Sequence, residues 1–174
     1  LAAASAVTVT LAGFTMGSPT AGGNVTVQTS ADPFPSVPQA SGVIGGQPSL
    51  SSFTMAASDR VAGNSRPLVT FSFTPTAGGA LGTSGLITLN YPSGFFASGT
   101  ISALSSTQGV TLAAASPGAS SIVITVTGGS LAAASAVTVT LAGFTMGSPT
   151  AGGGVTVQTS ADPVASAAQA SGVI

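Results

Sequence analysis

Two segments of this 174-residue chain lie 130 positions apart and carry almost the same sequence. Residues 1–44 and 131–174 differ at five of 44 positions, so that 44 − 5 = 39 are identical. Four of the differences fall within residues 34–38, and the fifth replaces Asn24 by Gly154. Chance does not produce such identity, so we read the chain as one 130-residue period followed by the first 44 residues of the next.

Prolines and glycines predict where one repeat meets the next. Three prolines between residues 33 and 38 favour an extended, semi-rigid spacer, and the run Gly45-Gly46-Gln47-Pro48 is a second interruption. The predicted divisions are the C-terminal part of a preceding β-sandwich repeat (1–32), a Pro/Gly-rich inter-domain linker (33–48), a complete β-sandwich repeat (49–162) and the start of the next linker (163–174).

The first 44 residues are too few to bury a core of their own. We therefore expect them to need an upstream part or another copy of the chain. The chain lacks an initial Met, and its first residues lack the basic stretch of a signal peptide, so we expect it to be an excerpt of a longer protein.

Strict alternation of apolar and polar residues dominates the complete repeat and predicts strands. The clearest segments are 68–74, 86–91, 121–127, 136–141 and 154–159, and weaker ones are 53–57, 99–104 and 108–113. The residues predicted to point inward are Val69, Phe71, Phe73, Ile87, Leu89, Tyr91, Ile122, Ile124, Val126, Val137, Val139, Leu141, Val155 and Val157. No helical period competes, so the predicted fold is an all-β, antiparallel β-sandwich, tandemly repeated with the 130-residue period.

Charge is nearly absent, and this excludes several functions. Only 3% of the residues are charged, and the chain has no Lys, Glu, His, Cys or Trp. Thiol chemistry, zinc binding and a catalytic triad therefore have no residues to use. Two arginines cannot neutralise a nucleic-acid backbone. We predict no enzyme, no catalytic residue, no cofactor, no metal and no nucleic-acid partner. No run of 18 apolar residues exists to form a membrane span.

The outward positions of the predicted strands carry Thr, Ser and Ala where most sandwiches carry Lys and Glu. Charges on edge strands normally prevent edge-to-edge pairing, and net charge keeps proteins apart. A surface of this kind should self-associate or be covered. The predicted partners are therefore neighbouring repeats or subunits, together with covalent glycans.

One N-glycosylation sequon is present, Asn24-Val25-Thr26, which makes Asn24 the candidate N-linked site. The second copy has Gly154 at the corresponding position. The abundant Ser, Thr and Pro also suit O-glycans. The alternative is that these hydroxyls serve only as strand and turn formers, and the sequence leaves both possibilities open.

Asp32 and Asp162 each stand in the sequence Thr-Ser-Ala-Asp-Pro at a predicted domain end. A calcium ion rigidifying the junction would need six to eight oxygens and usually several carboxylates. One Asp at each junction favours an Asx-type turn before Pro instead. For Asp59, beside Arg60 and close to Arg66, a local ion pair is the simplest interpretation.

The sequence Phe-Thr-Met recurs at residues 14–16, 53–55 and 144–146. Such large apolar residues are predicted to belong to the core. A carbohydrate-binding platform would use exposed Trp or Tyr, and the chain has a single Tyr.

Three stretches carry a resemblance to known proteins: residues 69–76 (VTFSFTPT), 86–96 (LITLNYPSGFF) and 153–162, which ends in Val-Gln-Thr-Ser-Ala-Asp. They resemble the Ig-like β-sandwich repeats of giant, low-charge extracellular proteins of microbial eukaryotes such as algae. The resemblance implies a tandem array of sandwiches in a secreted or cell-surface fibre, and it transfers no catalytic residue.

From these features we predict a structural repeat unit of an extracellular, glycosylated filament or cell-surface stalk, assembled from tandem or strand-complemented β-sandwiches. With strands of about eight residues at roughly 3.3 Å each, plus loops, each domain should advance the fibre by roughly 35–55 Å. The alternative is a ligand- or ice-binding surface protein that uses Thr-rich strand faces. Ice-binding solenoids need a short repeat that stacks Thr in register, whereas the period here is 130 residues.

Overall fold

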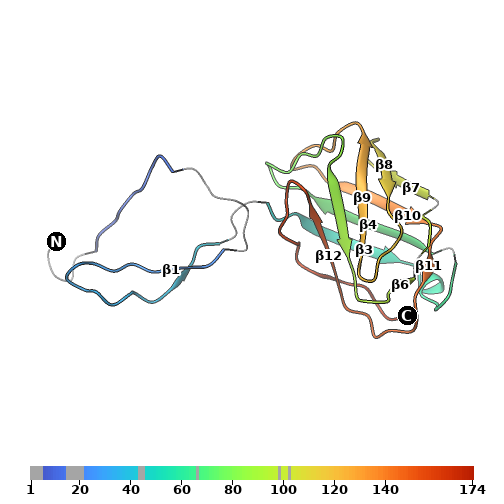
Figure 1. The fold of residues 1–174 in the computed structure, drawn as a ribbon, viewed down its shortest axis with the longest axis horizontal. Helices are drawn as coiled ribbons and strands as arrows, with labels where there is room; N and C mark the ends of the chain where they lie inside the picture. The colour runs from blue at the N-terminus through green and yellow to red at the C-terminus, as the bar shows by residue number, and fades with distance from the viewer. Residues whose placement is uncertain (1–5, 15–21, 43–45, 66, 98, 102) are drawn as a thin grey trace.

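The computed structural model describes residues 6–14, 22–42, 46–65, 67–97, 99–101 and 103–174. Within these residues the chain is all-β, its paired strands are antiparallel, and the one helical element is a short 3-10 turn, η1 (Ala57–Asp59). Two larger sheets lie against each other and form a sandwich from residues 46–174 (Figure 1).

The first large sheet has four strands in the order β3-β4-β10-β7. Their bounds are β3 (Ser49–Met55), β4 (Leu68–Thr74), β10 (Val137–Ala142) and β7 (Ala103–Ser106). The second has five strands in the order β13-β12-β5-β9-β8. Their bounds are β13 (Gln169–Ala170), β12 (Gly154–Thr159), β5 (Leu86–Asn90), β9 (Ser121–Gly128) and β8 (Thr111–Ala114).

Two small pairs complete the set of strands. β6 (Phe96–Ala97) pairs with β11 (Thr145–Met146), and β1 (Asn24–Val25) pairs with β2 (Gln39–Ala40). The segment that carries β1 and β2 lies to one side of the sandwich (Figure 1).

The core lies between the two large sheets and is formed by the alternate residues of each strand. Every residue that the sequence predicted to point inward is buried, from Val69 on β4 to Val157 on β12. Aromatic rings fill one end of this core: Phe96 makes edge-on contacts with Tyr91, Phe95 and Phe144 at centroid distances of 4.7, 4.8 and 4.7 Å. The antiparallel, all-β, sandwich-like fold predicted from the alternation is confirmed.

The strongest strand predictions agree with the structure within about one residue, whereas the weaker ones are displaced. The segment predicted at 53–57 is β3 at Ser49–Met55, that at 99–104 is β7 at Ala103–Ser106, and that at 108–113 is β8 at Thr111–Ala114. β3 contains an extra residue against β4 between Leu50 and Ser52, and this register shift interrupts the alternation that a sequence pattern detects.

Residues 163–174, which the sequence assigned to the start of the next linker, pack against the sandwich. β13 extends the second sheet along β12, and the Gln169 side-chain amide donates to the carbonyl of Leu50 on β3 (3.1 Å). The Ser166 hydroxyl accepts a hydrogen bond from the Val157 N–H (3.0 Å), and Ser166 is itself buried. Side-chain hydrogen bonds thus hold this segment against β12 and β3.

Candidate functional site

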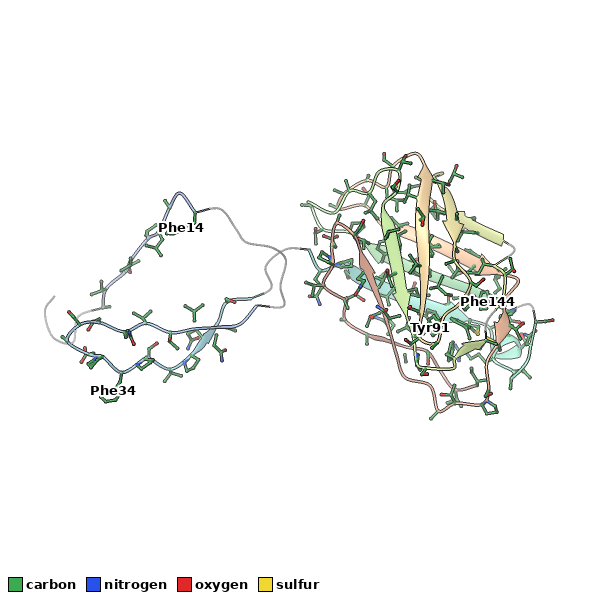
Figure 2. The ribbon with its side chains drawn as sticks, in the orientation of Figure 1. Phe14, Phe34, Tyr91 and Phe144 are labelled. Carbon is green, nitrogen blue, oxygen red and sulfur yellow. The ribbon has the colours of Figure 1, made fainter. Side chains whose placement is uncertain are left out.

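The N-terminal copy of the repeated sequence exposes the side chains that the C-terminal copy buries. Six apolar residues are 51–76% exposed in the first copy and 0% exposed at the corresponding positions of the second. The pairs are Val7 and Val137, Val9 and Val139, Leu11 and Leu141, Phe14 and Phe144, Val25 and Val155, and Val27 and Val157. Figure 2 shows Phe14 projecting from its segment, with Phe144 enclosed in the sandwich. The prediction that the Phe-Thr-Met sequences are core is wrong for Phe14; Met16 lies outside the described residues.

The two copies nevertheless share the same local hairpin. β1 and β2 pair Asn24 with Ala40, and β12 and β13 pair Gly154 with Ala170 in the same register. Corresponding hydrogen bonds have nearly equal lengths: Ser36 N to Val27 O (2.9 Å) matches Ser166 N to Val157 O (2.8 Å). Ser41 N to Gly23 O matches Ser171 N to Gly153 O at 2.8 Å each, and Thr29 N to Asp32 O (3.0 Å) matches Thr159 N to Asp162 O (2.9 Å). The hairpin of the first copy is therefore already shaped like the edge of a sandwich.

Asp162 holds one end of the complete sandwich together. Its carboxylate accepts hydrogen bonds from the Thr76 N–H (2.8 Å) and the Thr76 hydroxyl (2.5 Å), and the residue is fully buried. Gly46 and Gly79 pack directly on this carboxylate, and a methyl group on either would overlap it. The carboxylate therefore joins β12 to the loop after β4 and to the chain entering β3.

Both copies form a turn at the aspartate, but the side chain that closes it is that of Thr29 or Thr159 and not the Asp carboxylate of the predicted Asx-type turn. The Thr159 hydroxyl accepts from the Asp162 N–H (2.8 Å), and the Thr29 hydroxyl accepts from the Asp32 N–H (2.9 Å). Asp32 is exposed, whereas Asp162 is buried. In the part of the chain that the structure describes, no group of three acidic, His or Cys residues exists that could hold a metal ion.

Hydroxyl groups on the outer face of the first sheet bind one another across the strands. Ser72 and Thr138 are 2.6 Å apart and Thr70 and Thr140 are 3.3 Å apart, oxygen to oxygen. The Thr54 hydroxyl donates to the Thr70 carbonyl (3.1 Å). These hydroxyls stabilise neighbouring strands, which is an ordinary role for Thr and Ser pairs in a sheet.

Two other residues considered from the sequence, Asn24 and Asp59, lie on different elements, β1 and η1. Asn24 is an exposed residue of β1 in the first copy. The carboxylate of Asp59 accepts the Leu68 N–H (3.1 Å). Arg66 lies outside the described residues, so the predicted ion pair near Asp59 stays a prediction. Across the described ranges no helix is long and apolar enough to cross a membrane.

The buried face of the second copy was not identified from the sequence as a site, although one signal was available. All five differences between the copies fall at positions that are not buried in the sandwich: Gly154, Val164, Ala165, Ala167 and Ala168. Every buried residue of segment 131–174 is identical in segment 1–44. No known protein family matches the chain, and no curated protein shows significant similarity to it.

Proposed function

We propose that this chain is a structural repeat unit of an extracellular, glycosylated filament or cell-surface stalk, built from tandem or strand-complemented Ig-like sandwiches. The observation that carries the proposal is the pair of near-identical segments, one buried in a sandwich and one with the same apolar face exposed. Because residues 1–44 repeat the sequence of residues 131–174, which form part of the sandwich, the chain is suited to forming an array of sandwiches.

Two further properties support a structural role. The buried carboxylate of Asp162 serves to hold the sandwich together, since it accepts hydrogen bonds from the Thr76 N–H and hydroxyl. The outer hydroxyls of the first sheet, in the pairs Ser72–Thr138 and Thr70–Thr140, bond to each other. Ligand or ice binding by Thr-rich faces remains the alternative, and no observation favours it over the structural role.

The proposed location outside the cell agrees with the sequon at Asn24, which is exposed on β1. An N-glycan there would cover a surface on which charges are almost absent. Near-zero net charge gives little protection against non-specific association, so a glycan coat would supply the solubility that charges provide elsewhere.

Electron microscopy of the native material, averaged along any filament, tests this proposal. We expect a regular filament with one sandwich per axial repeat of roughly 35–55 Å and density beyond the polypeptide at Asn24 or at surface Ser and Thr. Discrete monomeric particles would contradict the proposed filament.

A further inference from the structure

Residues 6–14 and 22–42 carry exposed apolar side chains, and the structure itself contains a copy of this segment with its partner in place. In the second copy, β10 lies between β4 and β7, with Val139 opposite Phe71 and Ser106, and β12 lies against β5. We call residues 131–174 the donor, residues 46–130 the acceptor, and residues 6–42 the donor copy.

We propose that the donor copy completes the acceptor of a second copy of this sequence, taking there the place that the donor occupies in this chain. This deepens the proposed function and rests on its premise that sandwiches of this sequence occur together in more than one copy. Its partner is thus an open pair of sheets with a chemically matched apolar groove, filled by strand addition.

Complementarity is the first argument. The twelve positions at which the donor is buried carry the same residues in the donor copy and in the residues flanking it; they are Leu131, Val137, Val139, Leu141, Phe144, Met146, Val155, Val157, Thr159, Asp162, Ser166 and Ser171. The side chains that fill the groove, and the Asp that binds Thr76, are therefore available twice in each chain. No substitution between the copies would add or remove a group inside the groove.

Preorganisation is the second argument. The hairpin of the donor copy already has the register and hydrogen bonds of β12 and β13, including Gly23 N to the Ser41 hydroxyl (2.9 Å) and Val27 N to the Ser36 hydroxyl (3.0 Å). Their counterparts in the donor are also 2.9 and 3.0 Å long. Docking would require ordering mainly of residues 6–12, which form no strand here but correspond to the region of β10.

The linker between the donor copy and the acceptor of the same chain is too short for the two to combine, so the donor copy must bind the acceptor of another molecule or repeat. In the donor, Ser171 is hydrogen-bonded to Gly153, immediately before the start of β12. Gly46 lies against Asp162, just beyond the other end of β12. A donor copy placed in its own acceptor would therefore need a linker as long as β12. β12 has six residues, which span about 20 Å. From Gly42 to Gly46 the chain advances four residues, at most about 14 Å. The complete donor copy therefore cannot occupy the acceptor of its own chain in this arrangement.

The experiment uses the full chain with its own donor disabled. Val139→Asp places a carboxylate at a fully buried position of β10, and Val9→Asp makes the matched change at a position that is 74% exposed. Val139→Asp alone leaves one usable donor copy for each acceptor, so we expect chains linked head to tail. The double variant leaves no usable donor, and we expect neither assembly nor a sandwich. Val9→Asp alone should remain monomeric and folded.

Engineered cysteines report the register of the contact, because the natural chain has none. Thr8 corresponds to Thr138, whose hydroxyl lies 2.6 Å from that of Ser72. In the Val139→Asp background, Thr8→Cys with Ser72→Cys should give a ladder of disulfide-linked oligomers on a non-reducing gel. The matched control is Thr8→Cys with Ser52→Cys, because Ser52 pairs with Ser72 on the far side of β4 and lies about 10 Å from the expected position, beyond disulfide reach.

A ladder that needs Ser72→Cys and disappears when Val9→Asp is added supports the proposal. No ladder, equal ladders from both cysteine pairs, or a ladder that survives Val9→Asp overturns it. These results are independent of whether native material is filamentous. Discrete particles in microscopy would contradict the fibre and leave the strand exchange standing, whereas failure of the cysteine test would leave a fibre built by covalent tandem repeats.

A second measurement places no charge in the core. Residues 46–130 are fused ahead of the full chain, so that Ser130 is followed by Leu1 as it is naturally followed by Leu131. Phe14→Trp introduces the only Trp, and Phe144→Trp is the buried control. Acrylamide quenching of Phe14→Trp should fall several-fold on fusion and reach the level of the control. Quenching that stays at the level of the unfused chain overturns the proposal.

Discussion

The strongest test of the fold removes the same side chain from two identical local sequences. Phe14 and Phe144 both stand in Leu-Ala-Gly-Phe-Thr-Met-Gly, yet the first is 76% exposed and the second is 0% exposed. Phe144 also makes an edge-on contact with Phe96 at a centroid distance of 4.7 Å. Phe144→Ala should reduce the free energy of unfolding by about 3–5 kcal/mol, the usual cost of truncating a buried Phe. Phe14→Ala should change it by less than about 0.5 kcal/mol.

Urea unfolding at low micromolar concentration measures both values, and the low concentration limits association between chains. Tyr91, the only Tyr, is 4% exposed and touches Phe96, so its fluorescence reports the core while circular dichroism reports the sheets. With a slope of about 1.5 kcal/mol per molar urea, Phe144→Ala should lower the midpoint by about 2–3 M. Equal effects of the two substitutions, or a near-neutral Phe144→Ala, would refute the division into a buried and an exposed copy.

Other substitutions test the contacts around the core. Asp162→Ala leaves the Thr76 N–H and hydroxyl without their acceptor and should cost about 1–3 kcal/mol in urea unfolding, whereas Asp32→Ala should cost almost nothing. Gly46→Ala would overlap the Asp162 carboxylate and should also destabilise, by about 1–3 kcal/mol in the same assay. Burial raises the pKa of Tyr91 from 10.0 to about 12, so the unfolded chain binds fewer protons between these values. Stability should therefore fall as pH rises from about 10 to 12, and Tyr91→Phe should flatten this dependence in unfolding curves measured at pH 9 and 11.

The strands were predictable where successive residues point alternately to the core and to the surface. β4, β5, β9 and β12 bury every second side chain without interruption, and their limits follow from the sequence. The two-residue strands β6, β11 and β13 have no such period. β6 and β11 pair although they lie far apart in the sequence, and β13 forms by pairing with β12 in the hairpin. No pattern of two residues can indicate either pairing.

The candidate site was only partly predictable, for a different reason. The repeat and the need of residues 1–44 for a partner follow from the sequence. The sequence also predicted that the Asp162 side chain would serve an Asx-type turn, whereas its carboxylate binds Thr76. The bond to Thr76 spans 86 residues, and it depends on Gly46 and Gly79 leaving room for the carboxylate. Such contacts between distant residues leave no local periodicity.

Comparing the two copies shows which structure the repeated sequence forms by itself and which structure it forms only beside neighbouring strands. Both form the hairpin that pairs residues 14 or 16 positions apart, as in Asn24 with Ala40 and Gly154 with Ala170. Only the second forms β10, whose pairing with β4 joins residues as far apart as Ala142 and Leu68. Residues 6–12 have the same β-forming sequence as 136–142 but no neighbouring strand, and they adopt no strand. In this chain the hairpin is a local property, and the strand in the core exists only where an acceptor is present to receive it.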